Sequence, residues 1–212
     1  MELAFLRWIL IAVVAYLLGN ISTGLFVGRF FGTDIRKVGS GNAGTTNVMR
    51  TLGWVPSVAT LLGDVVKAVL AMLFGMWIDP EFGKFIAGVA VVTGHNWPVF
   101  FGFKGGKGIA SSLGVILMTD PWIALILLVI QFGILIPTKL MSLASISSAI
   151  AYPILVAIFH WGDWGYILFG VILGFMAVYS HRANIKRLIN KNENKLDFEK
   201  INEISKKSAK KN

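Results

Sequence analysis

Residues 38–50 read Val-Gly-Ser-Gly-Asn-Ala-Gly-Thr-Thr-Asn-Val-Met-Arg, and they separate two long apolar stretches of the chain. A second compact polar segment, residues 103–108, reads Phe-Lys-Gly-Gly-Lys-Gly and also lies between apolar stretches. Irregular polar backbone between membrane spans persists only where water or a ligand satisfies it. We therefore interpret the two segments as a binding site for an anion.

The composition is that of an integral membrane protein. Of the 212 residues, 55% are hydrophobic and 15% are charged, and there is no cysteine, which excludes disulfides and cysteine-ligated metal. The formal net charge is +9. Because the lysines and arginines flank apolar stretches or lie near the C-terminus, they fit cytoplasmic loops beside anionic membrane lipid, and we expect no nucleic-acid partner.

The apolar stretches predict an all-α polytopic membrane helix bundle. A transmembrane helix needs about 20 apolar residues. Seven stretches qualify as spans, at residues 5–28, 54–78, 83–101, 109–119, 121–138, 142–160 and 163–180. The fourth stretch is short and ends at Asp120-Pro121, where proline disfavours a continuing helix, so six spans with a re-entrant piece is the alternative.

The charges between the stretches predict the orientation. With seven spans and the N-terminus outside, the inner side receives basic residues, namely Arg29, Arg36, Lys37, Arg50, Lys104, Lys107, Lys139, Arg182, Lys186 and Arg187. The outer turns then carry Glu2, Asp79, Glu81, Asp120 and Asp163 against Arg7 and Lys84. This asymmetry follows the positive-inside rule and places both glycine-rich loops and the C-terminus in the cytoplasm.

The composition changes after residue 190, so we divide the chain into an integral membrane domain, residues 1–190, and a charged cytoplasmic tail, residues 191–212. Leu196, Ile201 and Ile204 are the spaced aliphatic residues of the tail. The tail is expected to be disordered or a short interfacial helix, without a chemical role.

The first loop formally matches a dinucleotide-binding fingerprint, with Asp64 lying 20 residues after Gly44. The context contradicts that match, because a membrane span precedes the glycines where the fingerprint requires a strand. Glycines still allow a nest of backbone N–H groups for phosphate, and Arg50 adds a planar guanidinium. The candidate ligand-binding residues of this loop are Ser40, Gly41, Asn42, Gly44, Thr45, Thr46 and Asn47. A plain glycine-rich turn is the alternative.

The second loop, Gly105-Gly106-Lys107-Gly108, resembles the end of a P-loop but lacks its first glycine and the hydroxyl residue that holds magnesium. We therefore expect no nucleotide hydrolysis and no metal. Lys107 between glycines, directly before an apolar helix, suits an anion, and a simple positive-inside anchor is the alternative.

Three polar residues within or at the end of the apolar stretches are expected to have supporting roles. His95 has no aspartate four residues later, as His-x4-Asp acyltransferases require, so we interpret it as a histidine that braces the loop. Asp64 and Lys67 lie three residues apart on one helix face and predict a buried ion pair.

The predicted topology brings two further polar elements to the same face. Ser142 is typical of a helix N-cap, and His181 and Asn184 follow the last span, where a cationic helix end is the plain interpretation. Asp34 is the one acidic residue that we place in the loops of this face, so no catalytic triad or paired carboxylates can be assembled there. Such a site suits substrates that bring negative charge and an activated bond.

These residues resemble three motif regions of the PlsY family of bacterial membrane acyltransferases. The regions are residues 38–50, residues 94–108, and Ser-Leu-Ala-Ser (142–145) with His-Arg-Ala-Asn (181–184). The resemblance implies that Ser40, Arg50 and Lys107 are catalytic and that Ser142, His181 and Asn184 hold glycerol 3-phosphate. It further implies that the backbone of residues 41–46 and of Gly105-Gly106 cradles acyl phosphate.

The family's activity implies acyl transfer from acyl phosphate to the sn-1 hydroxyl of glycerol 3-phosphate, the first step of bacterial phospholipid synthesis. It implies no cofactor, and a multi-pass location in the bacterial cytoplasmic (inner) membrane. The phosphate of glycerol 3-phosphate, directly or through Ser40, or else His181 or His95, would accept the hydroxyl proton. A transporter or channel for phosphate or a phosphorylated solute is the competing class, and a lipid-headgroup binder is a third.

Overall fold

A computed structural model describes residues 2–209, and within that range every regular element is helical. The α-helices are α1 (Glu2–Gly19), α2 (Thr23–Phe30), α3 (Thr45–Leu52), α4 (Trp54–Ile78), α5 (Gly83–Asn96), α6 (Ile109–Thr119), α7 (Pro121–Thr138), α8 (Met141–Phe159), α9 (Trp164–Ser180), α10 (Arg182–Ile189) and α11 (Phe198–Ala209). Two 3-10 turns, η1 (Ile35–Lys37) and η2 (Val99–Phe101), lie in the loops. The predicted all-α class is confirmed.

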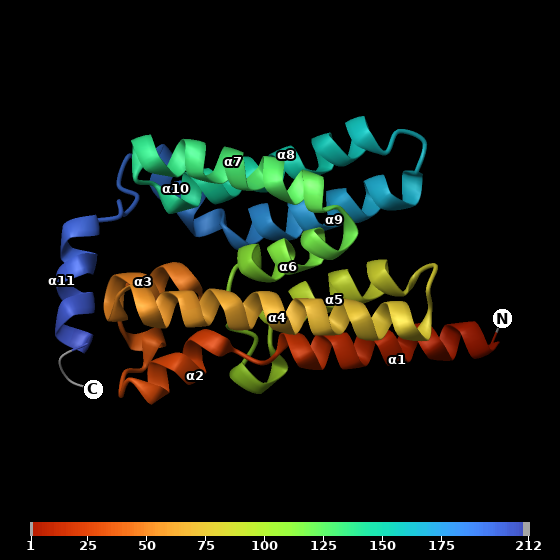
Figure 1. The fold of residues 1–212 in the computed structure, drawn as a ribbon, viewed down its shortest axis with the longest axis horizontal. Coiled ribbons are helices and arrows are strands. Elements are labelled where there is room, and N and C mark those ends of the chain that lie inside the picture. The colour runs from red at the N-terminus through yellow and green to blue at the C-terminus, as the bar shows by residue number, and fades with distance from the viewer. Residues whose placement is uncertain (1, 210–212) are drawn as a thin grey trace.

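The long helices form two groups that lie side by side (Figure 1). In one group α1, α4 and α5 pack together, and in the other α8 packs against both α7 and α9. The short helix α6 lies between the groups, packed on α4 and in contact with α7. The helices of the two groups run nearly parallel to the long axis, so their ends gather at the two ends of the molecule.

The core of the bundle is apolar and joins both groups. Among its fully buried side chains are Ile11 on α1, Met72 on α4, Val115 on α6 and Leu173 on α9. Many large apolar side chains on the outside of the bundle are exposed, such as Phe175, which is 68% exposed. Exposed aliphatic and aromatic residues around a bundle are typical of a surface that faces lipid tails.

Four helices of the described chain are long and apolar enough to cross a membrane, and the bent pair of α9 and α10 would make a fifth. The four candidates are Leu3–Phe30, Trp54–Ile78, Pro121–Thr138 and Met141–Phe159. The protein is therefore a polytopic membrane helix bundle. α6 has 11 residues, which at a rise of about 1.5 Å per residue cover only about half of a hydrocarbon layer roughly 30 Å thick.

The predicted span boundaries hold closely for the middle of the chain, at residues 54–78, 109–119 and 121–138. The break between α6 and α7 has the predicted cause: Pro121 is the first residue of α7, and the Asp120 carboxylate accepts hydrogen bonds from the backbone N–H groups of Trp122 and Ile123.

The expected span 5–28 corresponds to the candidate Leu3–Phe30, within which the helix is interrupted after Gly19, between α1 and α2. A second expected span differs more. The stretch 83–101 ends as a helix at Asn96, because Trp97-Pro98 leaves helical geometry and the chain turns into η2. Apolar composition alone did not reveal either break.

The C-terminal tail folds back onto the bundle. Leu196 and Ile201 are both 2% exposed and pack with Met49 of α3, Leu135 of α7 and Ala144 of α8. The ring of Phe198 stacks on that of Trp54, and Figure 1 shows α11 lying across the ends of α3 and α4. Of the two expectations for the tail, disorder does not apply to residues 198–209, and the expected helix is present; residues 210–212 lie outside the described part.

Candidate active site

A cavity of about 270 Å³ opens between residues of α3, the loop before α6, the start of α8 and α10. Its lining includes most of the predicted residues, namely Ser40, Asn42, Gly44, Thr45, Thr46, Asn47, Arg50, Asp64, His95, Lys107, Ser142, His181 and Asn184. The predicted residues outside this lining are Gly41, Lys67, Gly105 and Gly106. Segments that are distant in the sequence thus meet around one cavity.

Asn47 fixes the shape of the first loop. Its side-chain oxygen accepts the Ser40 N–H at 2.8 Å, and its Nδ2 donates to the carbonyls of Ile35 and Val38 at 2.9 and 3.1 Å. Gly39 has a φ of +60°, and a Cβ there would collide with the Asn47 side chain. We expected Asn47 to donate hydrogen bonds to a ligand. Its side-chain amide is instead bonded to three backbone groups, so Asn47 holds the shape of the loop.

Asn42 joins the two glycine-rich loops. Its oxygen accepts the Gly44 N–H at 3.0 Å, and its Nδ2 lies 3.4 Å from the Gly105 carbonyl oxygen. In the second loop, the N–H groups of Gly105 and Gly106 donate to the carbonyls of Asn96 and His95. These two amides hold the loop in place, and Lys107 and Gly108 are the residues of this loop that line the cavity.

Lys107 belongs to a chain of hydrogen bonds that runs into the tail. Its Nζ donates to Asn184 Oδ1 at 2.6 Å, and Asn184 Nδ2 donates to Glu193 Oε1 at 3.0 Å. Arg187 Nε donates to the other oxygen of Glu193 at 2.8 Å. The Glu193 side chain is only 3% exposed. A single buried carboxylate therefore orients two residues of α10, and through Asn184 it fixes the ammonium of Lys107.

Arg50 reaches the same part of the tail from α3. Its Nη2 donates to the Asn194 carbonyl at 3.0 Å, while its Nε is buried without a partner in the described chain. An unpaired guanidinium N–H beside a cavity is a free donor for an anionic ligand.

Burial affects both cations. It lowers the pKa of Lys107 to about 8, with Glu193 opposing the shift and Arg187 and Arg50 adding to it. Burial also lowers the pKa of Arg50, and Glu193 again opposes the shift. An incoming phosphate would relieve both effects, because it supplies negative charge to desolvated cations.

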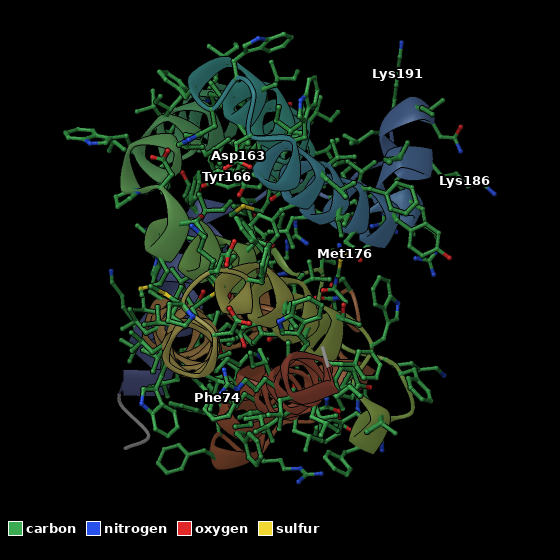
Figure 2. The ribbon with its side chains drawn as sticks, turned by 90° about the vertical axis from the view of Figure 1, so that its right-hand side faces the viewer. Phe74, Asp163, Tyr166, Met176, Lys186 and Lys191 are labelled. Carbon is green, nitrogen blue, oxygen red and sulfur yellow. The ribbon has the colours of Figure 1, made fainter. Side chains whose placement is uncertain are left out.

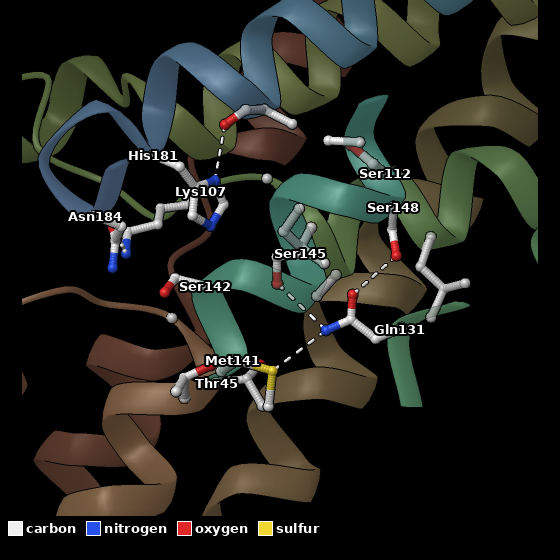
Figure 3. Close-up of a pocket in the computed structure, with 18 of the residues that line it drawn as sticks. Thr45, Lys107, Ser112, Gln131, Met141, Ser142, Ser145, Ser148, His181 and Asn184 are labelled. Atoms are coloured by element: carbon white, nitrogen blue, oxygen red, sulfur yellow. Dashed lines mark hydrogen bonds between the residues drawn. The ribbon is translucent and has the colours of Figure 1, made fainter. Parts of the chain in front are cut away.

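Hydroxyl groups around the cavity are buried and lack partners among the described residues, including those of Thr45, Ser112 and Ser142. The N-cap interpretation of Ser142 was wrong: Leu140 is the N-cap of α8, and Ser142 lies inside the first turn. Its hydroxyl is therefore not used by the helix. In Figure 3, Ser142 lies near Lys107, Asn184 and His181.

The imidazole of His181 has a defined tautomer. Its Nδ1 lies 2.8 Å from the Ala177 carbonyl oxygen, which can only accept, so Nδ1 carries the hydrogen. Nε2 of this buried ring is therefore a lone-pair acceptor beside Lys107 (Figure 3).

The cavity becomes apolar as it continues into the bundle. Its inner lining includes Leu61, Leu113, Ile116, Leu127, Leu128, Phe132 and Leu173. Several polar groups interrupt this lining, among them Gln131 of α7, which bonds to Ser145 and Ser148 of α8, as Figure 3 shows. A cavity that is cationic at one end and apolar at the other fits a molecule with a phosphorylated head and an aliphatic chain.

The predicted ion pair of Asp64 and Lys67 is present in α4. Lys67 Nζ lies 2.8 Å from Asp64 Oδ1, and the side chains are 4% and 1% exposed, respectively. His95 braces the second loop as expected, because its ring lies against Gly106, where a Cβ would collide with Nε2.

Glu193, Asn194 and Arg187 were not predicted from the sequence as parts of this site. Asp34 was expected to be the one acidic residue in the loops of the face, and the tail was expected to have no chemical role. The tail passes the cavity, however, and its Glu193 carboxylate lines it. The sequence feature that could have indicated this role is Glu193, which lies between two asparagines shortly after a cationic segment. By composition alone, such a glutamate cannot be distinguished from one in a solvated tail.

Comparisons with known proteins agree with this geometry. The family description "Glycerol-3-phosphate acyltransferase" matches residues 9–191. The chain is 44% identical over 189 residues to the glycerol-3-phosphate acyltransferase of Thermoanaerobacter sp. (strain X514), covering 89% of this chain and 95% of that protein. It is 44% identical over 200 residues to the enzyme of Clostridioides difficile (strain 630), covering 91% and 97%.

The fold is similar to that of crystal structures of PlsY (YgiH), an integral membrane glycerol 3-phosphate acyltransferase. Its glycerol 3-phosphate form superposes with a TM-score of 0.83 at 35% identity, over 90% of this chain and 96% of that chain. Its lysophosphatidic acid form gives a TM-score of 0.81 at 34% identity, over 92% and 97%.

The bundle and its amphipathic, phosphate-suited cavity thus define an integral membrane acyltransferase. The chain belongs to the glycerol-3-phosphate acyltransferase family, of the PlsY type. This result confirms the resemblance seen in the sequence, and it removes the transporter and the headgroup-binder alternatives.

The lowered pKa of Lys107 predicts a pH dependence of anion binding. Lysine is charged below its pKa, so raising the pH through about 8 removes the positive charge of Lys107 in the empty site. We expect the Kd for glycerol 3-phosphate to rise by up to about tenfold per pH unit above that value. Titration calorimetry between pH 7 and 9.5 measures this dependence.

The control for the pH series is Lys107→Arg, whose guanidinium stays charged throughout. This variant is expected to lose the steep rise of Kd. Equal pH dependence in the two proteins would show that Lys107 does not titrate in this range.

Proposed function

We propose that this enzyme transfers a fatty acyl group from acyl phosphate to the sn-1 hydroxyl of glycerol 3-phosphate, giving lysophosphatidate and inorganic phosphate. The shape of the cavity supports acyl phosphate as the acyl donor, because the cations Arg50 and Lys107 lie at one end of an otherwise mostly apolar lining. A compact phosphorylated head joined directly to an acyl chain fits this arrangement, and the family resemblance in the sequence implies the same donor.

The two loops support a division of the site between the substrates. Ser40, Asn42, Thr45 and Thr46, together with the backbone of residues 41–44, surround the acyl phosphate head in this proposal. Lys107, Ser142, His181 and Asn184 hold glycerol 3-phosphate. The unpartnered Ser142 hydroxyl and the unpartnered Nε of Arg50 support these roles, because buried polar groups without partners are costly unless a ligand pairs with them.

The reaction requires positioning more than activation. The sn-1 oxygen attacks the acyl carbonyl carbon, the bond from that carbon to the phosphate oxygen breaks, and phosphate leaves with the electron pair. Since a mixed anhydride is already activated, the protein aligns the two substrates and stabilises the oxyanion and the leaving phosphate. Arg50 and Lys107 supply positive charge at that point.

The hydroxyl proton needs an acceptor. Among the described residues that line the cavity, Glu193 is the carboxylate near Lys107. Its two oxygens are already bonded to Asn184 and Arg187, so we do not assign the proton to it. We assign the proton to the phosphate of glycerol 3-phosphate, directly or through Ser40. His181 is the competing acceptor, because its Nδ1 bond to Ala177 leaves Nε2 with a lone pair.

The proposed setting is the bacterial cytoplasmic membrane, with seven spans, the N-terminus outside and the active site facing the cytoplasm. The basic residues near the cavity end of the bundle support this orientation. Two of them, Lys186 and Lys191, point away from the helices (Figure 2). Glu81, in contrast, lies in the turn between α4 and α5 at the opposite end.

The donor is tested by supplying the purified enzyme in lipid with glycerol 3-phosphate and either acyl phosphate or acyl-CoA. We expect lysophosphatidate and one equivalent of inorganic phosphate from acyl phosphate, and no product from acyl-CoA. Product from acyl-CoA alone would contradict the assignment of the donor.

Replacement of Arg50 tests the need for a planar, bidentate donor. Arg50→Ala is expected to abolish turnover while the protein still inserts, and Arg50→Lys is expected to recover it only in part, because an ammonium cannot make two parallel bonds to a phosphate. Initial rates at saturating glycerol 3-phosphate measure the effect. Arg29→Lys, on the exposed face of α2, is the matched control, and full activity of Arg50→Lys would contradict the bidentate role.

The absence of cysteine from the sequence allows a direct test of orientation. Glu81→Cys is expected to react with a membrane-impermeant maleimide from outside intact cells, whereas Lys104→Cys and Lys191→Cys react only after the membrane is opened. Labelling of all three positions from one side would contradict the proposed topology.

A further inference from the structure

Lys67 is bonded to three acceptors, as many as its ammonium has hydrogens. Its Nζ lies 2.6 Å from the Ile21 carbonyl oxygen, 2.8 Å from Asp64 Oδ1 and 2.8 Å from His95 Nδ1. Asp64 also accepts a hydrogen bond from Thr23 at 3.1 Å. The side chains of Asp64, Lys67 and His95 are each at least nine-tenths buried. This cluster is therefore almost fully buried beside the cavity, and its hydrogen bonds determine how the imidazole is oriented.

The contact with Lys67 determines the tautomer of His95. An ammonium group can only donate, so Nδ1 must present its lone pair, and the ring hydrogen lies on Nε2. The opposite tautomer would place an N–H against a buried cation. Asp64 pairs with Lys67, and its Oδ1 lies 3.5 Å from Nδ1, farther than Lys67 Nζ at 2.8 Å. The two histidines near the cavity thus have opposite tautomers, since His181 carries its hydrogen on Nδ1.

The Nε2–H of His95 lies at the second glycine-rich loop. It faces the position where Gly106 has no side chain, and His95 lines the cavity. Within residues 2–209, no hydrogen bond engages this nitrogen, although the ring's other nitrogen is firmly held. Asn42 of the first loop contacts Gly105 directly beside it. The free N–H therefore lies where the loop assigned to the acyl phosphate head meets the loop of Lys107.

We propose that His95 is a further catalytic residue, which donates a hydrogen bond from Nε2 to an anionic oxygen of acyl phosphate, and that Asp64 and Lys67 are positioning residues that fix the required tautomer. The inference rests on acyl phosphate as the donor substrate. It also excludes His95 as the acceptor of the hydroxyl proton, because a base would need the lone pair at Nε2.

The tautomer can be measured without substrate or turnover. The chain has three histidines, so ¹⁵N-histidine labelling of the enzyme in lipid gives a simple NMR spectrum, and His95→Asn assigns the signals of His95. We expect a protonated Nε2 and an unprotonated Nδ1. In Lys67→Met, the Asp64 carboxylate becomes the partner of Nδ1, which is then expected to be protonated. A protonated Nδ1 in the wild type would overturn the proposal, whether or not Lys67→Met folds.

A matched pair of variants tests the donor role in the reaction. Gln places an amide N–H near the position of Nε2, whereas Asn offers Lys67 an oxygen near the position of Nδ1 but has no group at Nε2. We expect His95→Asn to lower kcat/KM for acyl phosphate by about ten- to hundredfold, the effect of one hydrogen bond to a charged group. His95→Gln is expected to restore most of this loss, and KM for glycerol 3-phosphate should change little in either variant.

His160→Asn, at the end of α8 far from Ser142, is the control and is expected to behave as wild type. Equal losses in His95→Asn and His95→Gln would reduce His95 to a structural residue and overturn the proposal. A rise in KM for glycerol 3-phosphate alone would do the same. If the wild-type enzyme made no product from acyl phosphate, the donor assignment would fail, while the NMR result would still decide the tautomer.

Discussion

Polar groups buried among apolar helices need partners within the protein, and this constraint shapes the whole site. The first loop is held because Asn47 pairs with three backbone groups, and the second because two carbonyls at the end of α5 accept its glycine amides. Once those bonds are made, the donors left available among residues 2–209 include the hydroxyls of Thr45 and Ser142, the Nε–H of Arg50, the ammonium of Lys107 and the Nε2–H of His95. These leftover donors are what a phosphorylated substrate meets.

The charges follow the same logic. Arg50, Lys107 and Arg187 are three positive charges that repel one another in a cavity of low dielectric constant. The negative charge of Glu193 reduces this repulsion but does not cancel the net positive charge. The remaining positive charge is directed by hydrogen bonds, since Asn184 holds Lys107 and Glu193 holds Asn184. The site is thus poised for anions before any substrate arrives, which is the arrangement that electrostatic stabilisation of a developing oxyanion requires.

The sequence was sufficient for the helix class, for several boundaries and for the convergence of residues 38–50, 103–108, 142 and 181–184 on one cavity, because apolar stretches and charge asymmetry report directly on the membrane. It was insufficient where a local pattern has two physical outcomes. Ser142 resembles an N-cap, yet α8 begins at Met141 and leaves its hydroxyl free. The Gly105 and Gly106 amides resemble a phosphate nest, yet they pair with the end of α5. The contact of Glu193 depends on how the tail packs, which no short pattern records.

The docking of the tail has a consequence for which part of the chain the pocket requires. Arg50 is anchored by the carbonyl of Asn194, and Lys107 depends on Glu193 through Asn184. Glu193 and Asn194 follow the last apolar stretch of the sequence, yet they complete the pocket. A chain that stopped after residue 190 would keep every apolar stretch and still lack both of these contacts.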